Sequence, residues 1–250
     1  MGTLLLKLAG PLQSWGCDSR FTERKTRHEP TKSGVVGLLA AAFGRRREDP
    51  IADLAALPMV MRIDQPGSYE RDFQTAHLRK FDKRTGEWVF DKSLPLSQRY
   101  YLADAVFVVG IGVPDEQIYA YEDALLHPAF PLYLGRKSCP PSGRVLIKAI
   151  HGADPLSALR EHPWEATSRR LLSAHRFDAT VDCTVVRDSE GEGSGTLIEE
   201  AVRDVPHSFS QLRREYGWRT VVYETIPVAN PNCIVLKEEH DPMAALEEMM

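Results

Sequence analysis

The sequence has few cysteines and no long hydrophobic run. Its four cysteines, Cys17, Cys139, Cys183 and Cys233, are far apart in 250 residues, with no C-x-x-C pair and no nearby histidine at zinc spacing. This argues against a disulfide framework or a structural metal site, and it fits a reducing cytoplasm. The apolar stretch at 3–9 is too short for a signal peptide. We therefore expect a cytoplasmic protein with no membrane anchor, no metal and no cofactor.

Signatures of the common enzyme classes are also missing. The chain contains no G-x-S-x-G, no H-E-x-x-H and no dinucleotide-binding fingerprint, and the TKS at 31–33 lacks the glycines of a phosphate-binding loop. The histidines are isolated along the chain. A metal-independent ribonuclease remains an alternative, because such a site needs only one histidine, a tyrosine and a lysine brought together in space, and the first candidates are His28, His77, Tyr133 and Lys137.

The net charge of −4 argues against a general nucleic-acid binder, but the charge is unevenly distributed. Between residues 17 and 47 there are eight basic residues and three acidic ones, and between 133 and 148 there are four basic residues and no acidic one. A local cationic patch attracts phosphates even on an acidic protein. The front of the chain therefore has the character of a phosphate-binding surface.

A short apolar helix is predicted over 30–44, with Thr31 as its N-cap and Gly44 at its C-terminus. Lys32 and Ser33 lie in the first turn, where the unpaired N–H groups and the helix dipole favour an anion. The helix start is therefore a candidate phosphate site. The alternative is a well-capped core helix whose lysine is merely solvated.

Hydrophobic patterning gives an α+β fold. The expected order over residues 1–150 is strand, helix, strand, strand, helix, strand, at 3–9, 30–44, 58–64, 100–112, 115–127 and 144–150. This is the ferredoxin-like or RNA-recognition-motif arrangement, with both helices on one face of an antiparallel sheet.

A long polar hairpin is predicted at about 68–98, with its turn at 82–87, as a projection from the 1–150 domain. It has little apolar surface to bury, so it needs something else to lie against, unless it is a flexible insertion.

A smaller strand-rich region is predicted over 151–250. A helix at 155–162 precedes its expected strands at 169–175, 180–187, 196–203 and 219–228. We expect a flexible turn at 187–195 and a fraying acidic end at 238–250.

Several cationic and polar segments are expected to leave the sheet domain together: the loop 20–27, the helix start, the hairpin and the glycine–arginine–lysine loop 134–138. Single-stranded RNA is bound by such a mixture of cations, backbone N–H groups and aromatic side chains, here Trp15 or Tyr100. The combination favours a nucleic-acid ligand over a purely structural scaffold.

Three stretches of the sequence closely resemble the CRISPR-associated Cas-five family, in its type I-E branch. They are LAGPLQSWG at 8–16, PTKSGVVGLLAA at 30–41 and YLGRKSCP at 133–140, and RYYLADA at 99–105 also fits. The resemblance implies a RAMP-type palm with an RNA-recognition fold and a thumb formed by the hairpin. It further implies a subunit of the Cascade complex that holds the 5′ handle of the CRISPR RNA (crRNA). The implied neighbours are a Cas-seven-family backbone subunit, a Cas-eight-family large subunit of the Cse-one type and, through the complex, target DNA.

The resemblance also implies which residues bind RNA. Carried onto this sequence, the RNA-binding residues are Gln13, Ser14, Arg20, Arg27, Lys32, Ser33, Gln74, Thr75, His77, Arg99, Arg136, Lys137 and Ser138. Relatives in type I-C systems cut repeat RNA themselves with a tyrosine, a lysine and a histidine, whereas in type I-E systems another subunit does so. We expect a non-catalytic protein here, with a metal-independent endoribonuclease as the alternative.

Overall fold

The computed structural model describes residues 1–16, 22–189 and 198–235, so the expected turn at 187–195 and the acidic end at 238–250 fall mostly or wholly outside the described residues. The helices are α1 (Lys32–Ala42), α2 (Ala52–Ala55), the 3-10 turn η1 (Asp115–Gln117), α3 (Ile118–Leu126), α4 (Pro155–Glu161) and α5 (Arg169–Ala174). None of these helices is both long and apolar enough to cross a membrane.

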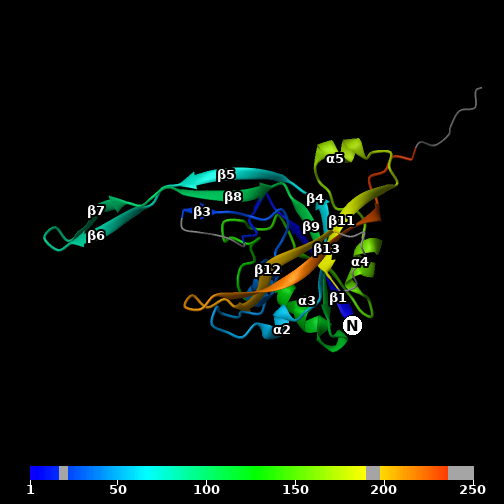
Figure 1. The fold of residues 1–250 in the computed structure, drawn as a ribbon, viewed down its shortest axis with the longest axis horizontal. Coiled ribbons are helices and arrows are strands. Elements are labelled where there is room, and N and C mark those ends of the chain that lie inside the picture. Colours follow the sequence, from blue (N-terminus) through cyan, green and yellow to red (C-terminus); the bar gives the residue numbers. More distant parts are fainter. Residues whose placement is uncertain (17–21, 190–197, 236–250) are drawn as a thin grey trace, which may run out of the picture.

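The strands of the sheet and of the hairpin follow one another along the chain (Figure 1). They are β1 (Gly2–Ala9), β2 (Leu12–Gln13), β3 (Glu23–Arg24), β4 (Met59–Gln65), β5 (Ser68–Gln74), β6 (His77–Asp82), β7 (Glu87–Ser93), β8 (Ser97–Ala103), β9 (Val106–Val113), β10 (Leu146–Ile150), β11 (Thr180–Asp188), β12 (Ile198–Ser208) and β13 (Glu215–Ala229).

The main sheet has seven strands in the order β10-β1-β9-β4-β11-β13-β12, and all neighbours are antiparallel. Its first four strands, with α1 and α3 between them in the chain, have the ferredoxin-like order, which confirms the predicted fold class. β11 pairs with β4, so the C-terminal strands continue this sheet.

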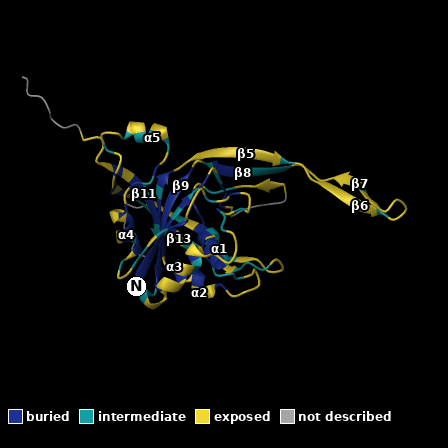
Figure 2. Ribbon diagram, turned by 180° about the vertical axis from the view of Figure 1, so that it is seen from behind, coloured by how far each residue is buried: buried dark blue, intermediate teal, exposed yellow. Residues whose placement is uncertain are grey.

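Both faces of the sheet are covered (Figure 2). Because side chains alternate along a strand, Leu4 and Leu6 of β1 pack with α1 and α3, whereas Leu5 packs on the other face with Leu159 and Trp164. The helix α4 and the loop after it therefore cover the face that the two-helix arrangement leaves open. Two clusters of apolar side chains result, one on each side of the sheet.

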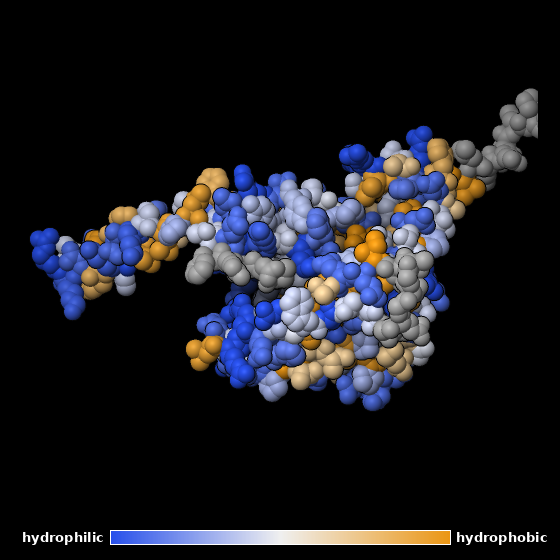
Figure 3. Space-filling view, in the orientation of Figure 1, coloured by the Kyte–Doolittle hydropathy of each residue, from blue (hydrophilic) through white to orange (hydrophobic). Residues whose placement is uncertain are grey.

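A long hairpin projects from the body (Figures 1 and 2). Its inner half is formed by β5 and β8, and its outer half by β6 and β7, with the turn at Gly86. Phe81, Trp88 and Phe90 on the outer half are each at least half exposed, and Figure 3 shows apolar side chains among hydrophilic ones along the projection. The outer half lacks a core of its own.

Two predicted elements were wrong. The run expected as one strand over 100–112 is two strands, because Asp104 takes a left-handed φ of 53° and the chain turns from β8 into β9. The segment expected as a strand at 169–175 is the helix α5, which begins after Ser168. Its Arg-Arg-Leu-Leu-Ser-Ala sequence contains no β-branched residue and several good helix formers.

Candidate nucleic-acid interface

Segments far apart in the sequence meet around β8. β2 pairs with one end of β8 through Gln13 and Leu102, and β3 pairs in parallel with the other end, Arg24 beside Arg99. The loop 133–139 joins them, because the Ser14 N–H donates to the Leu134 carbonyl at 3.1 Å. Stretches 8–16, 99–105 and 133–140 are therefore brought together.

Five cations gather where these segments meet, and we call them the basic junction: Arg24, Lys25, Arg99, Arg136 and Lys137. None of them forms an ion pair within the part of the chain that the structure describes. Asp72 lies opposite Arg99 in the β5–β8 register, but its carboxylate accepts from the Gln74 amide at 3.3 Å instead. The junction therefore keeps its positive charge.

Arg136 is held in place by its neighbours. Its Nη2 donates to the Arg24 carbonyl at 2.8 Å, and its guanidinium carbon lies 4.8 Å from the centre of the Tyr101 ring. The preceding Gly135 has a φ of +82°, and a Cβ on it would be 1.8 Å from the Ser14 carbonyl oxygen. Only glycine permits this close approach, which sets the position of Arg136.

Two nitrogen atoms of the junction are buried without a hydrogen-bond partner, Nε of Arg99 and Nη1 of Arg136. A buried polar group left unpaired costs about 1–3 kcal/mol, so nearly all such groups in native proteins have a partner. Each nitrogen is part of a charged guanidinium, whose best partner is a phosphate or carboxylate oxygen. Neither guanidinium therefore has its full set of hydrogen-bond partners among the described residues.

Gln13 and Ser14, predicted RNA-binding residues, have buried side chains. Gln13 donates to the Leu8 and Ala105 carbonyls at 3.1 and 2.7 Å and accepts from the Trp15 indole at 3.0 Å. The Ser14 hydroxyl donates to the Tyr100 carbonyl at 3.2 Å. Trp15 is 1% exposed, so the expectation that it stacks on a base was wrong.

Arg27, another predicted RNA-binding residue, is paired with acids inside the protein. Its guanidinium donates to Glu29 at 2.8 Å and to Glu200 of β12 at 2.9 Å, and the Tyr223 hydroxyl also donates to Glu200. Burial by itself would lower the pKa of Arg27, but these two carboxylates outweigh it and raise the pKa. The side chain ties the loop before α1 to the C-terminal strands.

The start of α1 is occupied by a carboxylate of the protein. Asp204 accepts from the Lys32 backbone N–H at 2.7 Å and from Arg219 at 2.6 Å, and its side chain is 1% exposed. The Lys32 ammonium lies 3.6 Å from Asp188. The Ser33 hydroxyl donates to Thr31, which caps the helix as predicted. The position expected to hold a phosphate therefore already holds an anion.

The predicted RNA-binding residues of the hairpin, Gln74, Thr75 and His77, lie where the inner and outer halves of the hairpin meet. Gln74 is opposite Ser97, two residues along β8 from Arg99. Thr75 is exposed, and His77 is 3.1 Å from the Ser93 hydroxyl with its ring 5.5 Å from that of Phe90.

The last three predicted RNA-binding residues are Lys137, Ser138 and Arg20. Lys137 and Ser138 are exposed in the loop 133–139, and the Ser138 hydroxyl lies 3.9 Å from the Cys139 sulfur. Arg20 lies outside the described residues.

The two histidines among the four ribonuclease candidates lie far apart. The His28 ring packs on Tyr69 at the start of β5, with a centroid distance of 4.7 Å, whereas His77 is eight residues further along the hairpin. At the rise of a strand this separates the two histidines by roughly 25 Å. Tyr133 and Lys137 lie in the loop 133–139, and Lys137 belongs to the basic junction. Within the described ranges no three or more His, Cys, Asp or Glu side chains are placed to hold a metal ion.

Known proteins match this chain over most of its length. The family model described as CRISPR-associated protein (Cas_Cas5) matches residues 3–222. CRISPR system Cascade subunit CasD from Escherichia coli (strain K12) is 33% identical over 168 residues, covering 62% of this chain and 75% of that protein. A solved chain from a CRISPR RNA-guided surveillance complex superposes with a TM-score of 0.72 at 29% identity, covering 99% of this chain and all of the other. A crystal structure of a Cas protein gives 0.65 at 36% identity, covering 92% and 99%.

Proposed function

This chain belongs to the CRISPR-associated Cas-five family, and on that premise we propose that it holds the 5′ handle of a crRNA at the basic junction. It does so as a non-catalytic subunit of a type I-E Cascade complex. The observation that carries the proposal is the pair of unpaired, buried nitrogens on Arg99 and Arg136 among cations that have no acidic partners within the described residues.

The chemistry of the junction fits single-stranded RNA. Phosphates accept from guanidinium groups, the side chains of Arg99 and Arg136 are partly exposed and have no acidic partner among the described residues, and Lys137 adds a flexible charge at the rim. Ser138 supplies a hydroxyl, and the hairpin residues Gln74, Thr75 and His77 continue the polar surface outward from β8. Shape and backbone contacts of this kind hold RNA in place, while base edges give sequence preference.

Five of the residues that the family resemblance implies receive a positioning role in this proposal: Gln13, Ser14, Arg27, Lys32 and Ser33. Their side chains make internal hydrogen bonds or ion pairs that fix the segment 13–14, the loop 22–29 and the start of α1, while the backbone N–H of Ser14 bonds the loop 133–139. They act on RNA through the elements they hold. Arg20 stays a prediction.

We propose a non-catalytic role because the family resemblance is to the type I-E branch, in which another subunit cuts the repeat RNA, and the incubation in EDTA described below tests it. The partners we propose are the Cas-seven-family backbone subunit, the Cas-eight-family large subunit and, through the assembled complex, target DNA. The free thiols of Cys139, Cys183 and Cys233 fit a reducing compartment, so we place the complex in the cytoplasm.

The test replaces Arg99 and Arg136 together by glutamine and measures binding of a repeat-derived RNA by fluorescence anisotropy at several salt concentrations. A hydrogen bond to a charged group contributes about 1.5–3 kcal/mol, so we expect each substitution to weaken binding about 10- to 100-fold. Loss of two phosphate contacts on a single strand should also reduce the salt slope by about 1.4. The matched control is Arg169→Gln with Arg170→Gln, which removes the same charge from exposed α5.

Unchanged RNA affinity in R99Q/R136Q, or an equal loss in the control pair, would overturn the proposed site. Incubating repeat RNA with the protein in EDTA tests the enzyme alternative separately. Cleavage there would establish a metal-independent endoribonuclease, and intact RNA is the result we expect.

A further inference from the structure

A second candidate site lies on the sheet face that α4 covers. In RNA-recognition modules the open face of a four-stranded sheet stacks on two or three bases. Here α4 and the loop after it close the middle of that face, since Leu5 and Val108 are fully buried with Leu159 and Trp164. The cover stops before the last residues of β1 and the first residue of β9, and a cavity of about 470 Å³ remains there.

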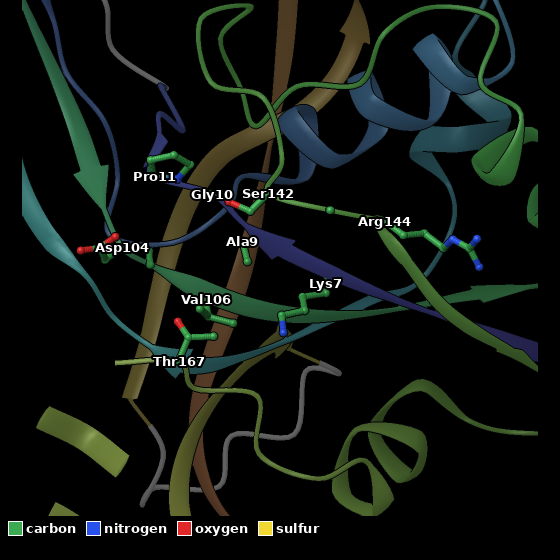
Figure 4. A pocket seen from close by; sticks show the side chains of 11 residues that line it. Lys7, Ala9, Gly10, Pro11, Asp104, Val106, Ser142, Arg144 and Thr167 are labelled. Atoms are coloured by element: carbon green, nitrogen blue, oxygen red, sulfur yellow. The ribbon is translucent and has the colours of Figure 1, made fainter. Parts of the chain in front are cut away.

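The cavity is mostly neutral. Ala9, Val106 and Pro11 give it apolar walls, and the hydroxyls of Ser142 and Thr167 make no hydrogen bond within the described residues. In Figure 4 the side chains of Ser142, Val106 and Thr167 surround its middle together with Lys7.

The charged side chains that line the cavity are either paired with an opposite charge or lie at its edges. The Lys7 ammonium is 2.6 Å from the Glu165 carboxylate, so it offers no net charge to a ligand. Asp104 and Arg144 lie at opposite edges of the cavity (Figure 4), and Arg144 is exposed and forms no ion pair among the described residues. The interior therefore suits an uncharged group, with the Arg144 guanidinium at one edge for an adjoining anion and the Asp104 carboxylate at the other.

The cavity and the basic junction share one segment of chain. Arg136 and Lys137 belong to the junction. The same loop continues to Ser142–Arg144, which line the cavity, and the Ser142 N–H donates to the Ala9 carbonyl at 2.9 Å. A strand of RNA that follows this loop passes from the junction to the cavity mouth.

We propose that this cavity receives one unstacked nucleobase of the RNA strand held at the junction, with Ser142 and Thr167 bonding its edge and Arg144 contacting a neighbouring phosphate. Its volume lies within the range of small-molecule sites, about 300–1,000 Å³. Its apolar walls and free hydroxyls match a planar group that has donors and acceptors at its edge. The proposal rests on the proposed function, because the base belongs to the same RNA.

The test uses the full chain and a set of single-stranded RNAs of about ten nucleotides, each carrying one photoreactive 4-thiouridine at a different position. After irradiation, peptide mapping should show that one position cross-links to residues 142–144 or to Thr167. Gly143→Tyr fills the cavity mouth. A Cβ at Gly143 meets no atom within 4 Å and its φ is not left-handed, so the fold should be kept.

We expect G143Y to abolish that cross-link and to weaken RNA binding about three- to tenfold, the equivalent of one or two hydrogen bonds. Thr167→Val, which removes only a hydroxyl, should weaken the cross-link without filling the site. Arg144→Gln should lower affinity, whereas Arg160→Gln, an exposed arginine on α4, should not.

The outcomes separate this inference from the proposed function. If RNA binds and R99Q/R136Q weakens that binding, but no position cross-links to the cavity and G143Y binds like the wild type, the cavity proposal is overturned and the junction stands. If RNA does not bind the wild-type chain, both are overturned.

Discussion

Replacing Gly135 by alanine should damage both the fold and RNA binding through a single methyl group. The residue has a left-handed φ of +82°, and its new Cβ would lie 1.8 Å from the Ser14 carbonyl oxygen and 2.8 Å from the carbonyl carbon. Both are backbone atoms, so no side-chain rotation relieves the overlap. The loop 133–139 must move away from Ser14, and it takes Arg136 with it.

Two costs add up in the G135A protein. The left-handed conformation costs alanine about 1–2 kcal/mol, and breaking the hydrogen bond between the Ser14 N–H and the Leu134 carbonyl adds about 0.5–1.5 kcal/mol. With some displacement of the Arg136 stack on Tyr101, we expect the free energy of unfolding to fall by about 2–4 kcal/mol in total. For a chain of this size that lowers the melting temperature by roughly 5–15 °C.

Thermal unfolding followed by circular dichroism, and RNA binding below the transition, check this prediction. G135A should bind RNA nearly as weakly as R136Q, because the guanidinium is displaced without being removed. Gly152→Ala is the matched control, because its φ of +64° is also left-handed but a Cβ there meets no atom within 4 Å; it should lose only about 1–2 kcal/mol of stability and leave RNA binding unchanged. A G135A protein that melts and binds like the wild type would refute the reasoning.

Two further predictions concern the ion pairs behind the site. Asp204→Asn should lower the free energy of unfolding, measured in urea, by about 3–5 kcal/mol, because it leaves Arg219 and the start of α1 without a buried carboxylate. Asp182→Asn, at an exposed position, is the control. An equally small effect of both substitutions would contradict the role given to Asp204. Burial lowers the pKa of His162 below 6.5 despite its Glu165 partner. The folded state therefore favours neutral histidine, so this stabilisation is present above about pH 6.5 and is lost as the pH falls. Urea titrations at several pH values should show that the free energy of unfolding falls less steeply toward low pH in His162→Gln than in the wild type. The same pH dependence in both proteins would argue against this role of His162.

Much of the fold followed from residue patterns. The first four strands and the two helices between them could be placed because apolar runs, caps and breakers such as Gly44 mark their limits. In the mostly apolar run at 100–112 a single aspartate, Asp104, was too weak a signal to mark the turn, although aspartate is one of the residues that tolerate a left-handed φ. The helix α5 was missed because six residues are too few for a clear period.

The site was harder to predict, because the acidic partners of its charged residues are far away in the sequence. Arg27 and Lys32 have the charge of phosphate-binding residues, but their partners Glu200 and Asp188 are more than 150 residues away in the chain. No local pattern shows that such a cation is already neutralised. Arg99 and Arg136 look no different in sequence, and only their unpaired nitrogens set them apart.

The pairing of β11 with β4 has a consequence for synthesis of the chain. The ferredoxin-like unit is complete once β10 has emerged from the ribosome, but β4 then still presents an open sheet edge, and Asp204 has not yet been made. An exposed edge of this kind invites pairing with other chains. A nascent or truncated form that ends near residue 150 would thus be prone to aggregate, and the loop before α1 would become ordered only after the last strands are in place.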